Sequence, residues 1–315
     1  MNYKAINLSI FLLFMIKTHI NGQNLKMIVS KKDSLSFIDY ESDKKWIKKI
    51  ESYSLSNSEI IKARVDVKFN FEYANENSNV IIEYNSVIED YINKYTSYRW
   101  LPKTYGLLNF YEPLFEAKLV EYGLPTDLKY LPIVESNMNP VAGSWAGASG
   151  LWQFMPGTGG QYGLGKTNNI NLFYDPYIST DAACRYLKRL YQMFGDWNLV
   201  LSAYNSGEGR VQKAINAAGT KNYWKVRNYL PAETRAYAPS FHAVRFIGKM
   251  YPLYYSFLPK LKYDYTQVKQ VIIKNNTTFR NFALKNKLNL QVLYFLNPHI
   301  VTEYIPKNVF LYYIN

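Results

Sequence analysis

Apolar residues between Tyr84 and Met250 recur at helical spacing, and this constrains the fold more than any other feature of the 315-residue sequence. The clearest helix follows Ser179-Thr180-Asp181 and stops at Gly195; its apolar face comprises Ala182, Ala183, Tyr186, Leu187, Leu190, Tyr191 and Phe194. Residues 197–204 are apolar nearly all round, which is typical of a buried helix. The pattern predicts a mainly α domain over residues 84–250 with a helix at its centre.

The longest predicted connection, residues 139–175, is rich in glycine: Gly143, Gly147, Gly150, Gly157, Gly159, Gly160, Gly163 and Gly165. Long irregular loops inside compact domains often carry function. We therefore look for chemistry in and beside this loop.

Scarce cysteine and histidine limit that chemistry. The chain has one Cys, Cys184, and three His, which excludes disulfide frameworks and cysteine zinc sites. A Ser-His-Asp site would depend on His242 or His299, because His19 lies in a segment expected to be removed. Catalysis is expected to use carboxylates, amides and hydroxyls, with no metal and no cofactor.

The charge is strongly positive, with 37 Lys and Arg against 24 Asp and Glu, a net +13. Such a surface attracts polyanions, including nucleic acids, anionic lipids and acidic wall polymers. The basic residues are scattered and form no stripe or recognisable nucleic-acid motif. We expect a generally basic solvated surface and no nucleic-acid partner.

The N-terminus resembles an export signal. Lys4 precedes the apolar stretch Ala5 to Ile16, which has the length of a signal-peptide core, whereas a membrane span needs about 20 apolar residues. A buried N-terminal helix is the alternative. We expect a signal peptide at 1–22 and a protein of the periplasm or cell envelope, monomeric and at most peripherally associated.

The flanking regions differ in composition from the helical domain. Within the extension 23–83, residues 65–73 alternate apolar and polar, which predicts a half-buried strand without an obvious partner. Residues 251–267 resemble a linker. Residues 268–315 form a predicted βααβ module, with strands at 268–273 and 309–314 and helices at 279–286 and 290–297.

Glu135 is the leading candidate for chemistry. It ends a short apolar helix containing Pro132 and opens onto the Gly-rich loop, and no Asp or Glu occurs between Ser136 and Tyr174. A carboxyl among apolar and aromatic groups keeps its proton to higher pH, as a general acid must. From the residues alone, a helix-terminal Glu that is solvated or paired with an Arg is the alternative.

Ordered motifs place the chain beside a known family. They are residues 135–140 (ESNMNP), 144–158 (SWAGASGLWQFMPGT), 162–164 (YGL), 194–197 (FGDW), 203–211 (AYNSGEGRV) and 230–237 (LPAETRAY). Together they resemble the signature of the Slt-type lytic transglycosylases, most nearly the membrane-bound lytic murein transglycosylase D group.

The resemblance implies a lysozyme-like fold of the goose-type/Slt kind and cleavage of the β-1,4 bond between N-acetylmuramic acid and N-acetylglucosamine in peptidoglycan glycan strands. It implies that Glu135 serves alone as acid and then base, whereas ordinary glycosidases use two carboxylates. The sugar's own 6-hydroxyl attacks C1 and leaves a 1,6-anhydro ring.

The resemblance also implies six substrate-binding residues: Ser144, Gln153, Tyr204, Asn205, Glu233 and Tyr237. The first two would hydrogen-bond the substrate near the reacting sugar. Tyr204 and Asn205 would contact the N-acetyl group or stabilise charge, and the last two would complete the cleft floor. Two positions depart from the family pattern: Gly160, where Arg or Lys is usual, and Met138, where an aromatic is usual.

The C-terminal module resembles LysM, a βααβ sugar-binding domain. Ala283, Leu296-Asn297-Pro298 and Ile305-Pro306 fit, but the usual Gly-Asp-Thr-Leu turn reads Asn276-Thr277-Thr278-Phe279. Glycan binding and a purely packing role both remain open. For the whole chain, a lysozyme-like hydrolase and an inactive peptidoglycan-binding protein are the alternatives to a lytic transglycosylase.

Overall fold

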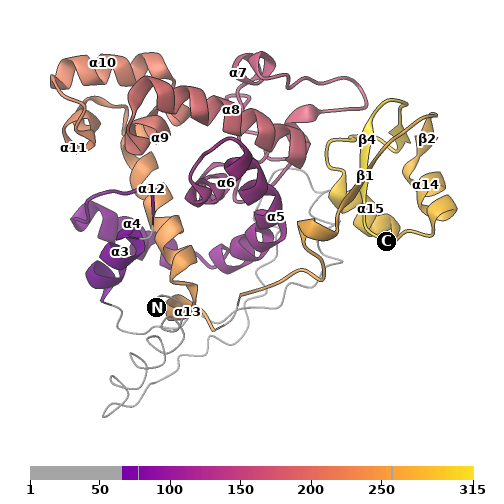
Figure 1. The fold of residues 1–315 in the computed structure, drawn as a ribbon, viewed down its shortest axis with the longest axis horizontal. Helices are drawn as coiled ribbons and strands as arrows, with labels where there is room; N and C mark the ends of the chain where they lie inside the picture. The colour runs from indigo at the N-terminus through magenta and orange to yellow at the C-terminus, as the bar shows by residue number, and fades with distance from the viewer. Residues whose placement is uncertain (1–65, 77, 257) are drawn as a thin grey trace, which may run out of the picture. The chain divides into compact units, whose positions relative to one another are not determined.

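The computed structural model describes residues 66–315, with gaps at 77 and 257 (Figure 1). The predicted signal peptide and most of the predicted extension lie outside the described residues. Within the described residues, no helix is long and apolar enough to cross a membrane.

The fold is mainly helical up to residue 267 and ends in a small part that contains sheet, as predicted (Figure 1). The α-helices of the first part are α3 (Val67–Glu76), α4 (Ser86–Thr96), α5 (Leu101–Glu121), α6 (Leu131–Ser136), α7 (Pro156–Gln161), α8 (Pro176–Phe194), α9 (Trp197–Ser206), α10 (Glu208–Ala218), α11 (Tyr223–Val226), α12 (Ala232–Lys249) and α13 (Tyr251–Tyr254). Short 3-10 helices lie between them: η2 (Thr126–Tyr130), η3 (Leu172–Tyr174), η4 (Arg227–Tyr229) and η5 (Tyr265–Gln267).

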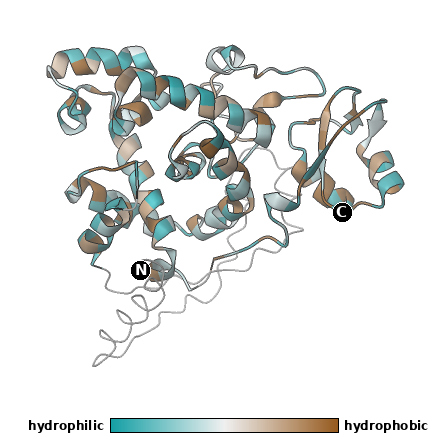
Figure 2. Cartoon of the chain, viewed as in Figure 1, coloured by the Kyte–Doolittle hydropathy of each residue, from teal (hydrophilic) through white to brown (hydrophobic). Residues whose placement is uncertain are grey.

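Helix α9 is the predicted central helix, and its burial is confirmed. Its first seven residues are all buried, and it packs against α8, α10 and α12. Asp196 caps its start by accepting a hydrogen bond from the Leu199 amide (2.9 Å), and Gly207 follows its end with a φ of 87°. In Figure 2 the long helices around it change between hydrophilic and hydrophobic colours along their length, as amphipathic helices do.

Helix α8 begins earlier than predicted. Asp175 caps it by accepting from the amides of Tyr177 (2.9 Å) and Ile178 (3.0 Å), and Pro176 occupies the first turn. The hydroxyls of Ser179 and Thr180 therefore lie inside the helix and donate to carbonyls one turn back. An Asp cap followed by Pro is a complete start signal, which the prediction at residues 179–181 missed. The predicted stop at Gly195, with φ 69°, is confirmed.

The strand predicted at residues 65–73 is wrong, because the segment forms helix α3. Its buried residues are Asn70, Phe71 and Ala74, which share a helical face. The Phe71 ring packs against Tyr84 (5.5 Å between centroids) and Phe246 (5.4 Å). Packing against the helical domain therefore determines the conformation of this segment and outweighs the strand preference of its alternating apolar and polar residues.

The predicted strand-helix-helix-strand order of the C-terminal residues is confirmed. Strand β1 (Lys269–Ile272) pairs antiparallel with β4 (Phe310–Tyr313) and places Val271 opposite Leu311, and α14 (Phe279–Asn286) and α15 (Leu290–Leu296) lie between them in sequence. Two short strands not predicted, β2 (Thr277–Thr278) and β3 (Tyr304–Ile305), also pair antiparallel. The Tyr312 hydroxyl donates to the fully buried carboxylate of Asp175, 3.1 Å from each oxygen.

Candidate active site

Glu135 lies in the last turn of α6, a short helix with α5, α8 and α12 around it in Figure 1. Leu131, Pro132 and Ile133 are buried and anchor the helix. The proline is tolerated because it falls in the first turn, where its missing N–H has no helical partner to lose. The helix therefore stops with Glu135 at the start of the Gly-rich loop.

Burial gives Glu135 the character of an acid. The side chain is half-buried, and burial raises the pKa of its carboxyl from 4.5 to about 8. The Tyr237 hydroxyl donates to Oε1, which favours the charged form and lowers this pKa, whereas the charge of Glu233 raises it. The balance leaves the carboxyl protonated at neutral pH, as a general acid requires.

Helix α12 supplies Tyr237 and Glu233 from its first two turns. Tyr237 is buried and Glu233 is exposed. Burial, followed by the charge of Glu135, raises the pKa of the Tyr237 phenol well above its ordinary value, so it remains a hydrogen-bond donor. The structure thus brings both predicted residues to the Glu135 carboxyl.

The end of α9 supplies Tyr204 and Asn205. The Tyr204 hydroxyl donates to the Trp152 carbonyl (2.8 Å), and its ring lies 5.3 Å from that of Tyr186. Asn205 Oδ1 accepts a hydrogen bond from Thr234 Oγ1 (2.9 Å), which joins α9 to α12. Burial and then the charge of Glu135 raise the pKa of Tyr204, which places this side chain in the same electrostatic environment as the acid.

The Gly-rich loop carries Ser144 and Gln153. Ser144 is exposed, and its hydroxyl accepts from the Ala148 amide (2.9 Å) to close a tight turn. Gln153 has a φ of 45°, and its Nε2 donates to the carbonyls of Gly150 (2.8 Å) and Ala142 (3.1 Å). Its amide nitrogen therefore shapes the loop. Within the described residues, neither Ser144 nor Gln153 hydrogen-bonds to Glu135.

Two residues that support the site were not predicted from the sequence. Trp152 is fully buried. Its carbonyl accepts a hydrogen bond from the Tyr204 hydroxyl, and its Nε1 donates to Thr180 Oγ1 (2.9 Å). Thr234 is buried and positions Asn205. Both lie inside the motif blocks, but only contacts in space distinguish them from ordinary core residues.

Within the described residues, no set of three or more His, Cys, Asp or Glu is placed to hold a metal ion. His242 is fully buried, its Nε2 lies 2.7 Å from Asn198 Oδ1, and burial holds its pKa well below the ordinary value. It belongs to the core and does not contribute to the Glu135 site.

Comparison with known proteins agrees with the motif blocks. Residues 112–227 match the family described as the transglycosylase SLT domain. The chain is 47% identical over 131 residues to membrane-bound lytic murein transglycosylase D of Escherichia coli strain K12, which covers 40% of this chain and 28% of that protein. It is 35% identical over 117 residues to the soluble lytic murein transglycosylase of the same strain, which covers 33% of this chain and 17% of that protein.

Among solved structures, the 70 kDa soluble lytic transglycosylase of Escherichia coli matches with 26% identity and a TM-score of 0.39, covering 44% of this chain and 24% of that one. The matches thus span less than a third of each relative's length. The predicted resemblance is confirmed: residues 112–227 match the transglycosylase SLT domain, and Glu135 lies within the matched residues.

Proposed function

We propose that the protein is a peptidoglycan lytic transglycosylase in which Glu135 is the single acid and base. One observation carries the proposal: Glu135, inside the SLT domain match, has a carboxyl pKa of about 8 and receives a hydrogen bond from Tyr237 on α12. The matched relatives bear the name lytic murein transglycosylase. The chemistry follows from the protonation state of this carboxyl.

In the first step, neutral Glu135 donates its proton to the glycosidic oxygen, and the bond from that oxygen to C1 of N-acetylmuramic acid breaks. The carboxylate that remains is stabilised by the Tyr237 hydroxyl. In the second step it accepts the proton of the sugar's 6-hydroxyl, whose oxygen bonds to C1. Glu135 returns to its neutral form, and the products are a free 4-hydroxyl and a 1,6-anhydro ring.

The other predicted residues bind the substrate in this proposal. Tyr204 and Asn205 contact the N-acetyl group or the charge that develops on the ring, and Ser144 and the Gln153 carbonyl oxygen contact the sugar nearby. Glu233 is a second carboxylate near the acid, and its charge helps Glu135 keep its proton. If Glu233 instead activated a water, the protein would be a lysozyme-like hydrolase.

Clearing of a sacculus suspension tests Glu135 directly. Glu135→Gln keeps the size and the hydrogen-bond acceptor but has no proton to transfer, and general acid catalysis contributes about 100- to 10,000-fold. We expect a loss in that range with unchanged sacculus binding. Equal clearing by the variant and the native protein would place the acid elsewhere, and no clearing by either would favour a peptidoglycan-binding protein.

We further propose that the protein works in the periplasm or cell envelope as a monomer, with peptidoglycan glycan strands as its partner. The positive charge suits a polyanionic wall. The LysM-like C-terminal residues are either a glycan-binding module or a packing element. A pull-down on sacculi separates these roles when the native protein is compared with variants whose solvent-facing aromatic residues in the C-terminal part are replaced. Weaker binding of the variants indicates a glycan-binding module, and unchanged binding indicates a packing element.

A further inference from the structure

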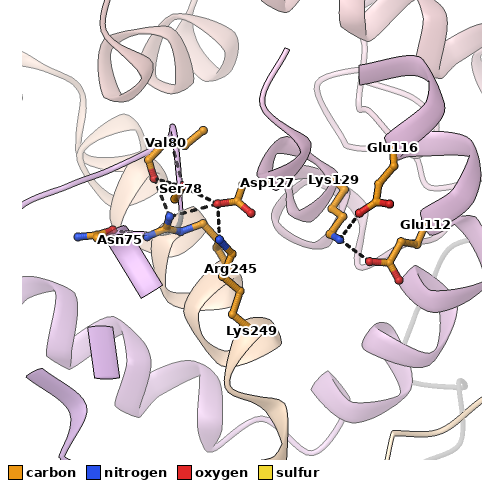
Figure 3. A network of polar contacts seen from close by, with 9 residues as sticks. All are labelled: Asn75, Ser78, Val80, Glu112, Glu116, Asp127, Lys129, Arg245 and Lys249. Atoms are coloured by element: carbon orange, nitrogen blue, oxygen red, sulfur yellow. Dashed lines mark hydrogen bonds and ion pairs between the residues drawn. The ribbon is translucent and has the colours of Figure 1, made fainter. Parts of the chain in front are cut away.

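One short segment outside the SLT domain match bonds to two helices that carry the site, α9 and α12, and to η2, which leads into the third, α6. Residues 78–82, here called the brace, follow α3 and lie far ahead of residue 112, where the SLT match begins. The brace bonds to η2, which leads directly into α6, and to α9 and α12. Figure 3 shows two of these contacts, which converge on Arg245 and Asp127.

The contact with η2 is made by Ser78. Its hydroxyl donates to Asp127 Oδ2 (2.5 Å), and Asp127 is 7% exposed. Four residues after Asp127 the chain enters α6, which carries Glu135. Lys129, also on η2, pairs with Glu112 and with Glu116 (2.6 Å) of α5, so η2 is fixed from both sides (Figure 3).

The contact with α12 is made through Arg245, a fully buried arginine. Its Nη1 donates to the Val80 carbonyl (2.7 Å) and lies 3.3 Å from Asp127 Oδ2, and its Nη2 donates to Asn75 Oδ1 (2.5 Å). Lys249, one turn further along α12, lies 2.8 Å from the same Asp127 oxygen. The buried charges are thus paired and hydrogen-bonded to the brace, to α3 and to η2.

The contact with α9 is made by Asn198. Its Nδ2 donates to the Ile81 carbonyl (3.0 Å), and its Oδ1 lies 2.7 Å from His242 Nε2 on α12. This contact is in the first turn of α9, whereas Tyr204 and Asn205 are in the last. At about 1.5 Å per residue, the braced and catalytic ends are separated by about 9 Å on α9 and about 12 Å on α12, from Tyr237 to Arg245.

We infer that the brace is a positioning element that sets how α6, α9 and α12 meet at the site. The inference rests on the proposed function of these helices. Helices are stiff over such distances, and a buried network of paired charges and hydrogen bonds favours one arrangement of its partners. Because misplacement of about 1 Å can cost 100-fold in rate, a loose brace would affect Glu135 without touching it.

The test uses Ser78→Ala, which removes the bond from the brace to Asp127, and Asn75→Ala, which removes the bonds of α3 to Arg245 and to the Ile82 carbonyl of the brace (2.7 Å); both leave the site residues intact. Ser78→Thr keeps the hydroxyl and serves as the conservative rescue. Asn289→Ala is the matched control: it removes the cap of α15, whose amide partners at residues 291 and 292 lie outside the network. Carbon-13 NMR titration of Glu135, assigned with Glu135→Gln, reads the site without requiring activity.

We expect both alanine variants to remain folded and to lower the Glu135 pKa by about one unit, because loosened packing admits water. We also expect kcat on a short soluble glycan to fall about tenfold with KM within about twofold. Ser78→Thr restores native values and Asn289→Ala leaves them unchanged.

The role of the brace would be overturned if both alanine variants kept the native Glu135 pKa and the native kcat. It would also be overturned if Asn289→Ala changed both quantities as much as the alanine variants do. A native protein that cleaves no glycan would refute the proposed function alone, because the NMR titration still decides whether the brace positions Glu135.

Discussion

At the scale of single residues, the Glu135 carboxyl is governed mainly by burial. Tyr237 stabilises its charged form and Glu233 its neutral form, and burial outweighs both. A carboxylate at a helix end would ordinarily be ionised at neutral pH. In the proposed mechanism the same pKa therefore affects both catalysis and stability, and both decline as pH rises.

In the proposed mechanism, activity depends on the neutral form of the Glu135 carboxyl. Since the Glu135 pKa is about 8, kcat/KM on a soluble glycan is expected to be constant below pH 7 and to fall as pH rises through 8. Initial rates between pH 5 and 10 measure this midpoint. A midpoint near 4.5, the ordinary value, would show that Glu135 is not held in the buried state described here.

Tyr237→Phe removes a hydrogen bond to the charged form of Glu135 while keeping the ring. We expect the midpoint of kcat/KM to rise by about one unit, because a hydrogen bond to a charged group contributes about 1.5–3 kcal/mol and part of it is replaced by water. A downward or absent shift in the pH profile would contradict the bond to Oε1.

Stability also falls as pH rises, but the fall begins at a lower pH. The folded-state pKa of Glu135 is raised from 4.5, so the favourable contribution of this group is complete below pH 4.5 and is lost as pH rises to about 8. Glu135→Gln has no charge to bury. Between pH 4.5 and 9, the free energy of unfolding of the variant, measured in urea, is expected to rise by about 1–2 kcal/mol relative to that of the native protein. A constant difference would contradict the raised pKa.

At the scale of elements, the Gly-rich loop is fixed by close backbone packing. Gly150 has a φ of 83°, and a Cβ built there would lie 1.9 Å from the Phe173 carbonyl oxygen. Gly147 has a φ of 91° but nothing within 4 Å of such a Cβ. The two positions therefore separate backbone strain from collision.

Gly147→Ala is expected to cost about 1 kcal/mol of unfolding free energy through strain alone. Gly150→Ala is expected to cost about 3 kcal/mol or more, because the loop must also move away from Phe173. Chemical denaturation of both variants measures the difference. Equal losses would show that the approach of Gly150 to Phe173 does not hold the loop.

Elements with strong local signals were predictable from the sequence, and elements decided by distant contacts were not. The buried run of α9 and the stop of α8 at Gly195 required only periodicity and turn chemistry. Helix α3 was missed because Phe71 packs on Phe246, far along the chain. At the site, the motif predicts Glu135 as the acid, but it gives neither the bond from Tyr237 of α12 to this carboxyl nor the hydrogen bonds of the Gln153 amide within the loop.

At the scale of the whole molecule, we expect the charge of +13 to affect binding to the wall more than cleavage. We expect sacculus binding to weaken as salt rises from about 50 to 500 mM, since salt screens exposed charges. Cleavage of short soluble glycans is expected to change little. Co-sedimentation and product release measure the two separately, and salt-independent sedimentation would show that charge does not drive wall binding.

We propose that Glu135 transfers protons within one sugar and activates no water. Mass spectrometry of fragments from purified peptidoglycan distinguishes the two reactions, because a hydrolytic fragment is heavier by one water than its 1,6-anhydro counterpart. We expect anhydro ends that disappear with Glu135→Gln. Fragments that all carry the added water would contradict it and identify a lysozyme-like hydrolase.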